Sequence, residues 1–190
     1  MKPEFAVTIT NNFKIFGDSM IPLDEFDLKI LRVLQENARV TTQELAERVG
    51  LSATPCARRV KRMEDEGVID RYVTLLDPEQ LGIGLRVFVN VRLNTQAAKT
   101  FDAFEAAVRK LPEVMGCYLL AGNYDYLIHV RVADVETYRH FIRDRLVAIE
   151  GVGETQSSIV LEETKHTTAL PLPVVNQHRS GPPRRSASSP

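Results

Sequence analysis

The sequence lacks the features that mark several large classes of protein. It has no tryptophan and only two cysteines among 190 residues, and Cys56 and Cys117 stand far apart on predicted core faces. This usage is typical of buried thiols in a reducing compartment and argues against a scaffold built on disulfides. No apolar run approaches the roughly 20 residues that a membrane helix needs, and the N-terminus has no signal-peptide pattern. We therefore expect a cytoplasmic protein with no membrane partner.

An excess of charge of either sign is also missing. The 24 lysines and arginines nearly balance the 25 aspartates and glutamates, which gives a formal net charge of −1. A protein with so little net charge does not bind polyanions over its whole surface, so any nucleic-acid site must be a local patch. The composition, 44% hydrophobic and 26% charged, is that of an ordinary globular protein.

Arrangements that would support metal binding or catalysis are absent as well. The four histidines are scattered, and with two distant cysteines they give no metal-ligand spacing. Gly82-Ile83-Gly84 precedes a predicted strand instead of following one, so it is not a dinucleotide-binding fingerprint. No motif brings a nucleophile together with a base. We therefore expect no metal, no cofactor and no enzymatic activity.

Residues 23–67 have the apolar periodicity of helices. A first helix opens at Leu23-Asp24. Thr41 and Glu44 have the spacing of a capping box, which predicts a short second helix that ends at Gly50. Only two residues separate it from a third helix, and helices joined so tightly make a helix-turn-helix on a trihelical core. The predicted inward stripe of the first helix consists of Phe26, Ile30, Val33 and Leu34.

The third helix, from Ser52 to Gly67, has the most informative pattern in the chain. Ser52 is a good N-cap because its hydroxyl can accept a hydrogen bond from a free amide of the first turn, and Gly67 commonly ends a helix. A rotation of about 100° per residue places the apolar Cys56, Val60 and Met63 on one narrow face. The opposite face carries hydroxyl and cationic side chains.

That cationic face predicts a contact with DNA. Most charge runs are simply solvated, but this one follows a tight helix–helix turn and lies opposite an apolar seam, so we expect the helix to enter a DNA groove. Arg58 and Arg62 are one turn apart and could both reach base edges or phosphates, and which of them reads a base stays open. The acidic Glu64–Glu66 end would repel DNA, so we expect it to point away. The predicted DNA-binding residues are Thr41, Thr42, Ser52, Thr54, Arg58, Arg59, Lys61 and Arg62.

A different pattern follows the helices. Val68–Leu76 is predicted to be extended and could form a small wing, which Asp77-Pro78 ends. From Leu85 to Leu93 apolar residues alternate with polar ones, as in a strand with one buried face. The further elements are a helix at 97–111, strands at 114–120 and 125–132, a helix capped by Asp134 and a strand at 155–161. This order predicts a ferredoxin-like βαββαβ domain, so the fold class is α+β.

Two motifs in this order resemble one known family. The pattern LSATPCARRVKRME at residues 51–64 and the stretch AGNYDYLIHV at residues 121–130 are similar to those of the Lrp/AsnC ("feast/famine") family of transcription factors. The resemblance extends from about Leu23 to about Val175. It implies a bacterial or archaeal, nucleoid-associated protein that binds double-stranded DNA and forms homodimers assembling into octamers. It also implies an effector, an amino acid or related metabolite, in a cleft between effector domains of adjacent dimers.

The resemblance assigns effector binding to the loop Gly122–Asp125. A hairpin turn by itself explains Gly122 and Asn123, but not a carboxylate at the start of an apolar strand. Asp125 could accept hydrogen bonds from the ammonium of an amino acid. Backbone amides and hydroxyls could donate hydrogen bonds to the carboxylate of that amino acid. Asn123 stands where the family commonly has Asp, which lowers the local negative charge. The predicted effector-binding residues are Gly122, Asn123, Asp125, Thr155 and Ser157.

Together these patterns predict five segments. They are a disordered leader or early-start extension, a winged helix-turn-helix DNA-binding domain, a linker, a ferredoxin-like effector-binding and dimerisation domain, and a disordered tail rich in proline, serine and arginine. Their predicted bounds are 1–21, 22–72, 73–84, 85–175 and 176–190.

We therefore predict a sequence-specific DNA-binding transcriptional regulator whose DNA binding or assembly responds to an amino acid. The open alternative is a DNA-architectural protein whose C-terminal domain serves only oligomerisation. A small metabolic enzyme, or its regulatory subunit, would leave the arginines of the third helix without a purpose. The strand Leu85–Leu93 has an outer face bearing Phe88 among polar residues, which suits a dimer contact.

Overall fold

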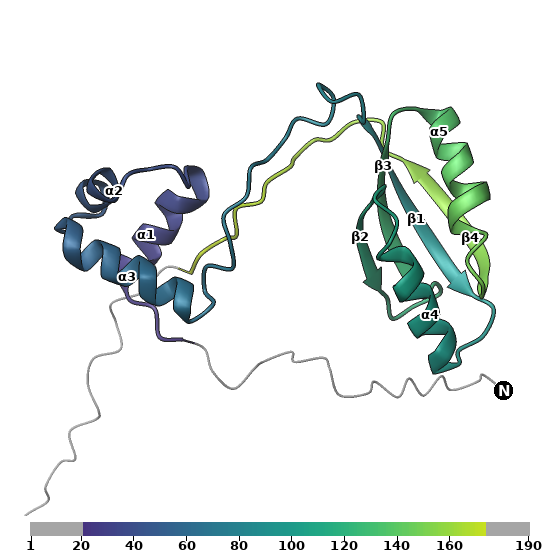
Figure 1. The fold of residues 1–190 in the computed structure, drawn as a ribbon, viewed down its shortest axis with the longest axis horizontal. Helices are drawn as coiled ribbons and strands as arrows, with labels where there is room; N and C mark the ends of the chain where they lie inside the picture. Colours follow the sequence, from purple (N-terminus) through teal and green to yellow (C-terminus); the bar gives the residue numbers. More distant parts are fainter. Residues whose placement is uncertain (1–20, 174–190) are drawn as a thin grey trace, which may run out of the picture. The chain divides into compact units, whose positions relative to one another are not determined.

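The computed structural model describes residues 21–173, so residues 1–20 of the predicted leader and the whole predicted tail lie outside the described residues. The described chain forms two compact units (Figure 1). The helical unit contains residues 21–73 together with residues 167–173, and the effector unit contains Thr74–His166. Within residues 21–173, no helix combines the length and the apolarity that crossing a membrane requires.

The helical unit consists of α1 (Glu25–Glu36), α2 (Thr42–Val49) and α3 (Ala53–Asp65). Reciprocal capping boxes open the first two helices: Asp24 with Asp27, and Thr41 with Glu44 as predicted. Gly50 has φ of 77°, a left-handed conformation that ends α2 and turns the chain into α3. The predicted trihelical helix-turn-helix is confirmed.

The helical unit differs from the prediction at two places, the buried stripe of α1 and the cap of α3. The buried stripe of α1 contains Asp27, Leu28, Ile30 and Leu31, so of the predicted stripe only Ile30 is fully buried. The sequence pattern failed here because it treats an aspartate as outward-facing, whereas Asp27 is buried by its ion pairs. On α3 the predicted Cys56 and Met63 are fully buried. Ser52 is the N-cap of α3, but its hydroxyl makes no capping hydrogen bond.

The segment after α3 contains no strand in the described part of the chain. Residues 70–77 are irregular, and several of their apolar side chains are exposed, so the predicted wing is a coil. The C-terminal segment 167–173, which was predicted to belong to the effector domain, packs on the helical unit instead. The Leu170 amide donates to Gln35 Oε1 at 2.6 Å, and Leu172 packs against the helical core. The chain therefore passes between the two units twice.

The effector unit is a four-stranded antiparallel sheet with strand order β2-β3-β1-β4. Helix α4 connects β1 to β2, and α5 and a π-helical turn η1 connect β3 to β4 (Figure 1). The predicted ferredoxin-like order is confirmed, although the last strand begins and ends earlier than 155–161. The bounds are β1 (Leu85–Leu93), α4 (Ala98–Val108), β2 (Val114–Leu119), β3 (Tyr126–Val132), α5 (Val135–His140), η1 (Phe141–Leu146) and β4 (Val152–Ile159).

One face of the sheet packs against the helices and forms the core of the effector unit. Alternate residues of β1 and β3, including Val89 and Ile128, are fully buried with Phe104 of α4. The side chains between them point to the other face, because successive residues of a strand face opposite sides. There the Phe88 ring stacks on His129 with 5.1 Å between the ring centroids.

Candidate DNA-binding surface and effector loop

A buried carboxylate holds two of the arginines on α3. Asp27 has no exposed surface, and its Oδ1 accepts a hydrogen bond from Arg59 Nη1 at 2.8 Å and its Oδ2 one from Arg62 Nη2 at 2.5 Å. Arg59 Nη1 also lies 2.6 Å from Asp24 Oδ2. Hydrogen bonds to Asp27 and Asp24 raise the pKa of Arg59. Because a buried charge requires a partner, these two guanidinium groups fix α3 against α1.

The remaining polar side chains of α3 are available to a ligand. Ser52, Thr54 and Arg58 are exposed, and Arg58 makes no ion pair or side-chain hydrogen bond with any residue in the range 21–173. Lys61 is exposed too, but its ammonium lies 2.6 Å from Asp65 Oδ1, one turn along the helix. Of the three arginines predicted to contact DNA, Arg58 alone is therefore unengaged among the described residues.

The two threonines of α2 have different surroundings. Both are exposed, but the Thr41 hydroxyl is engaged in the capping box: it donates to Glu44 Oε2 at 2.9 Å and accepts from the Glu44 amide at 3.2 Å. Thr42 lines a small cavity together with Lys61. The predicted capping box therefore engages the hydroxyl of Thr41, which was also predicted to contact DNA.

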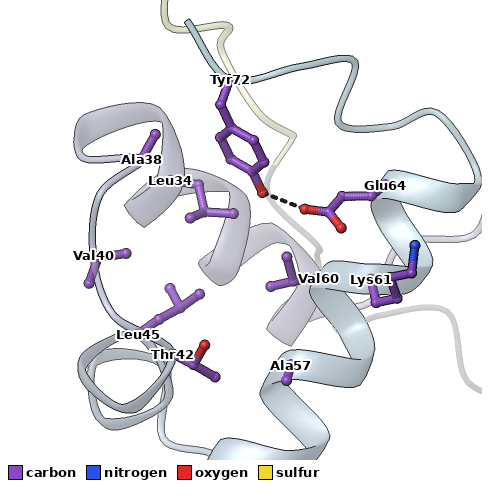
Figure 2. Close-up of a pocket in the computed structure, with 10 residues that line it drawn as sticks. All are labelled: Leu34, Ala38, Val40, Thr42, Leu45, Ala57, Val60, Lys61, Glu64 and Tyr72. Carbon is purple, nitrogen blue, oxygen red and sulfur yellow. Dashed lines mark hydrogen bonds between the residues drawn. The ribbon is translucent and has the colours of Figure 1, made fainter. Parts of the chain in front are cut away.

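The cavity beside Thr42 lies within the helical unit and has a volume of about 220 Å³ (Figure 2). Apolar side chains such as Leu45 and Val60 line it, and the ring of Tyr72 closes one side. The Tyr72 hydroxyl donates to Glu64 Oε1 at 2.9 Å, and burial together with Glu64 raises the pKa of Tyr72 to about 12. The acidic end of α3 thus fastens the coil that follows the helix.

In the effector unit, the predicted loop residues are held by contacts that the sequence did not reveal. Asp125 Oδ2 accepts from the Leu93 amide at 2.7 Å, and Asp125 Oδ1 accepts from Gln96 Nε2 at 2.9 Å. The carboxylate therefore satisfies the backbone at the end of β1, where the pairing with β4 shifts register. This explains a carboxylate that the turn alone left without a reason. Gly122 and Asn123 are exposed.

Arg92 of β1 organises the rest of the loop. Its Nε donates to the Asn123 carbonyl at 2.9 Å, its Nη1 lies 2.9 Å from Glu154 Oε2, and its guanidinium lies over the Tyr124 ring, 5.1 Å from the centroid. Sequence reasoning missed this residue. The signal that could have found it is the polar position on β1 one residue before the strand ends.

The predicted effector residues on β4 lie on the face of the sheet that the helices cover, opposite to the face that carries Arg92. Thr155 and Ser157 are opposite Val91 and Val89 of β1, whose side chains are buried beneath the helices. The Ser157 hydroxyl accepts from the Tyr138 hydroxyl of α5 at 2.5 Å. Within one described chain, these two side chains and the Arg92–Asn123 contact are therefore separated by the sheet.

Comparison with known proteins agrees with the division of the chain into a helical unit followed by an effector unit. Residues 23–70 match the model of a winged helix-turn-helix DNA-binding domain, and residues 86–170 match that of the Lrp/AsnC ligand binding domain. The leucine-responsive regulatory protein of Salmonella typhimurium is 43% identical over 148 residues, which cover 78% of this chain and 90% of that protein. The chain belongs to the Lrp/AsnC family.

Other similar proteins cover a comparable share of the chain. The DNA-binding transcriptional activator DecR of Escherichia coli K12 is 40% identical over 150 residues, 79% of this chain and 99% of that protein. A transcriptional regulator of Neisseria meningitidis, solved in complex with L-Met, is 47% identical with a TM-score of 0.77, over 79% of this chain and 97% of its own. Escherichia coli AsnC is 28% identical with a TM-score of 0.73, and the match covers 78% of this chain and 99% of the AsnC chain.

The family assignment confirms the predicted resemblance and the fold class. It makes this chain a transcriptional regulator with a helix-turn-helix DNA-binding domain followed by a ligand-binding domain. The family is one of regulators and not of enzymes. The individual DNA-binding and effector-binding residues remain predictions.

Proposed function

We propose that this chain reads DNA through a surface made by Ser52, Thr54, Arg58 and Lys61 of the helix-turn-helix. One observation carries the proposal: Asp27 engages Arg59 and Arg62, which leaves Arg58 as the guanidinium of α3 that has no partner among residues 21–173. An arginine in this position can donate two hydrogen bonds to a guanine or contact a phosphate. Arg59 and Arg62 serve to position the helix, so the DNA-binding set proposed from the structure is smaller than the set predicted from the sequence.

The test is an affinity series on the protein's own promoter DNA at several salt concentrations. Arg58→Gln is compared with Arg139→Gln, which changes an exposed arginine on α5 of the effector unit. If Arg58 reads a guanine, Arg58→Gln should lose about 1–3 kcal/mol of binding free energy, and this loss should depend on the base at that position. If it contacts a phosphate, the loss is uniform and the salt dependence of log K falls by about 0.9. Unchanged binding by Arg58→Gln would refute the proposal.

We further propose that the protein acts as a homodimer in the cytoplasm and assembles to octamers on nucleoid DNA. One α3 contacts too few base pairs for strong specificity, and a two-fold dimer reads two half-sites about one helical turn apart. The outer face of the sheet, with the stacked Phe88 and His129, is the surface that supports a contact between copies. Sedimentation of Phe88→Ser against the wild type tests this, because loss of the dimer should accompany loss of DNA affinity.

An amino acid is the proposed effector. The matched ligand-binding domain and the L-Met complex of the Neisseria regulator support this class of ligand. The effector must bind two assembly states with different affinity, or it cannot shift the balance between them. Thermal shift and sedimentation with a panel of all common amino acids at fixed salt test the proposal. A panel in which none of them changes either property would favour a purely architectural protein.

A further inference from the structure

Residues 167–173, the C-terminal arm, are held on the helical unit by a small number of surface contacts. The side-chain amide of Gln35 on α1 makes two hydrogen bonds with Leu170: its Oε1 accepts from the Leu170 amide at 2.6 Å, and its Nε2 donates to the Leu170 carbonyl at 3.3 Å. Leu172 packs against the helical core and is the one residue of the arm that is partly buried. The arm is therefore attached through its backbone and one apolar side chain.

The sequence of the arm favours this docking. Leu170-Pro171-Leu172-Pro173 alternates leucine with proline. Proline fixes its own φ and keeps the residue before it extended, so the free arm has few conformations to lose when it docks. A further contact is made at the end of the arm, where Arg32 Nη2 of α1 donates to the Pro173 carbonyl at 3.3 Å.

The docked arm closes a short connection from the effector unit to the helical unit. After β4, Glu163 forms an ion pair with Arg86 of β1, whose side chain is largely buried. The chain is therefore anchored on the effector unit at Glu163 and on the helical unit at Leu170. Because an extended chain spans about 3.3–3.6 Å per residue, these two anchored residues can be at most about 25 Å apart.

The other connection, which follows α3, is longer. Its first anchor is Tyr72, whose hydroxyl donates to Glu64 of the helical unit. Its second is the Gly84 carbonyl, which accepts from Arg131 Nη1 at 3.4 Å in the effector unit. Fully extended, the chain between these anchors would reach about 40 Å. The arm therefore restrains the helical unit more tightly than the other connection does.

We infer that the docked arm sets the half-site spacing that this regulator reads, with Gln35 and Leu172 as positioning residues. Undocking leaves only the longer connection, which lets each helical unit move further from its effector unit. The effective concentration of the second helical unit at its half-site falls as the linker lengthens, and the preference for one spacing weakens with it. This inference rests on the proposed homodimer and adds the part of the chain that fixes the spacing.

The experiment measures the affinity of the full chain for three duplexes at one salt concentration. The first carries the two half-sites protected in the protein's own promoter, the second separates them by about five more base pairs, which is half a helical turn, and the third has one half-site. We expect the wild type to bind the respaced duplex about tenfold or more weakly than the first.

Two variants loosen the short connection by different means. Gln35→Ala combined with Leu172→Ala undocks the arm, whereas an insertion of about six Gly and Ser residues after Lys165 lengthens the connection and leaves the contacts of the arm in place. In both, the loss on respacing should shrink to about threefold or less, while the affinity for one half-site stays within about twofold of the wild type. The matched control is Glu36→Ala, which changes an exposed neighbour of Gln35 and should behave as the wild type.

The outcomes separate this inference from the proposed homodimer. If both variants lose as much affinity on respacing as the wild type, or if the wild type prefers the pair of half-sites but tolerates respacing, the inference is overturned and the homodimer stands. It is also overturned if only the undocked variant is affected, and equally on all three duplexes, because the arm then merely stabilises the helical unit. A wild type that binds one half-site as tightly as the pair refutes the homodimer and this inference with it. Should Gln35→Ala with Leu172→Ala melt early, the insertion carries the test.

Discussion

Replacing Asp27 by asparagine should loosen α3 from α1 with little change of shape. The asparagine keeps one oxygen near Arg59 and Arg62 but removes the negative charge that pairs with both. Breaking a buried ion pair costs about 3–5 kcal/mol. The two arginine side chains are 28% and 40% exposed, so solvent screening reduces the loss and we expect about 2–3 kcal/mol. For a helical unit of this size, that corresponds to a fall in melting temperature of roughly 10–20 °C.

Circular dichroism during heating measures the loss of stability. If Asp27→Asn destabilises the helical unit alone, that unit melts first and accounts for the early part of the transition. The control is Asp65→Asn, which removes the exposed pair with Lys61 on the same helix and should leave the melting temperature unchanged. A second readout concerns DNA. Freed from Asp27, Arg59 and Arg62 become available to phosphates, and each new phosphate contact should steepen the salt dependence of log K by about 0.9.

Two results would refute the reasoning behind this prediction. The first is an Asp27→Asn protein that melts within about 3 °C of the wild type, which would mean that the buried carboxylate adds little to stability. The second is a variant that folds but loses DNA affinity as strongly as Arg58→Gln, with a reduced salt dependence. That result would place Arg59 or Arg62 on the DNA and return them to the recognition surface.

Three further predictions concern other parts of the molecule. Burial lowers the pKa of His129, and the nearby Arg86, Arg131 and His166 lower it further. The unfolded chain therefore takes up the proton before the folded chain as the pH falls through the ordinary histidine pKa. Stability contributed by neutral His129 should therefore be complete above that value and decline below it, and the melting temperature of His129→Gln should depend less on pH there. Gln35→Ala removes two hydrogen bonds to Leu170 and should expose the Leu170 amide to hydrogen exchange, at a cost of about 1 kcal/mol. Gly50→Ala forces a side chain into a left-handed backbone and should destabilise the helical unit by about 1–2 kcal/mol in a denaturant titration.

Much of the fold could be predicted because it depends on local chemistry. Thr41 with Glu44, and Asp134 at the start of α5, are capping signals that need only a few neighbouring residues. The alternation in β1 placed Val87, Val89 and Val91 in the core correctly, because a strand turns successive side chains to opposite faces. The irregular conformation of residues 70–77 was not predicted, since a strand also needs a partner that the sequence does not identify.

The candidate site shows where local reasoning ends. A helical wheel gives Arg58 and Arg62 the same direction, because it contains only the geometry of one helix. The helix that lies beside α3 decides between them: α1 presents Asp27, and that carboxylate engages Arg62 and Arg59. In the same way, the position of Asp125 was visible in the sequence, but its bond to the Leu93 amide depends on how two distant strand ends meet.

By itself, the sequence determined the helix-turn-helix, the order of the ferredoxin-like elements and the family, because caps, periodicities and short motifs are written in neighbouring residues. The tertiary structure alone decided which arginine stays free, on which face of the sheet Thr155 and Ser157 lie, and that residues 167–173 return to α1. These depend on contacts between residues far apart in the chain, such as Gln35 with Leu170, and no local pattern specifies such a pair.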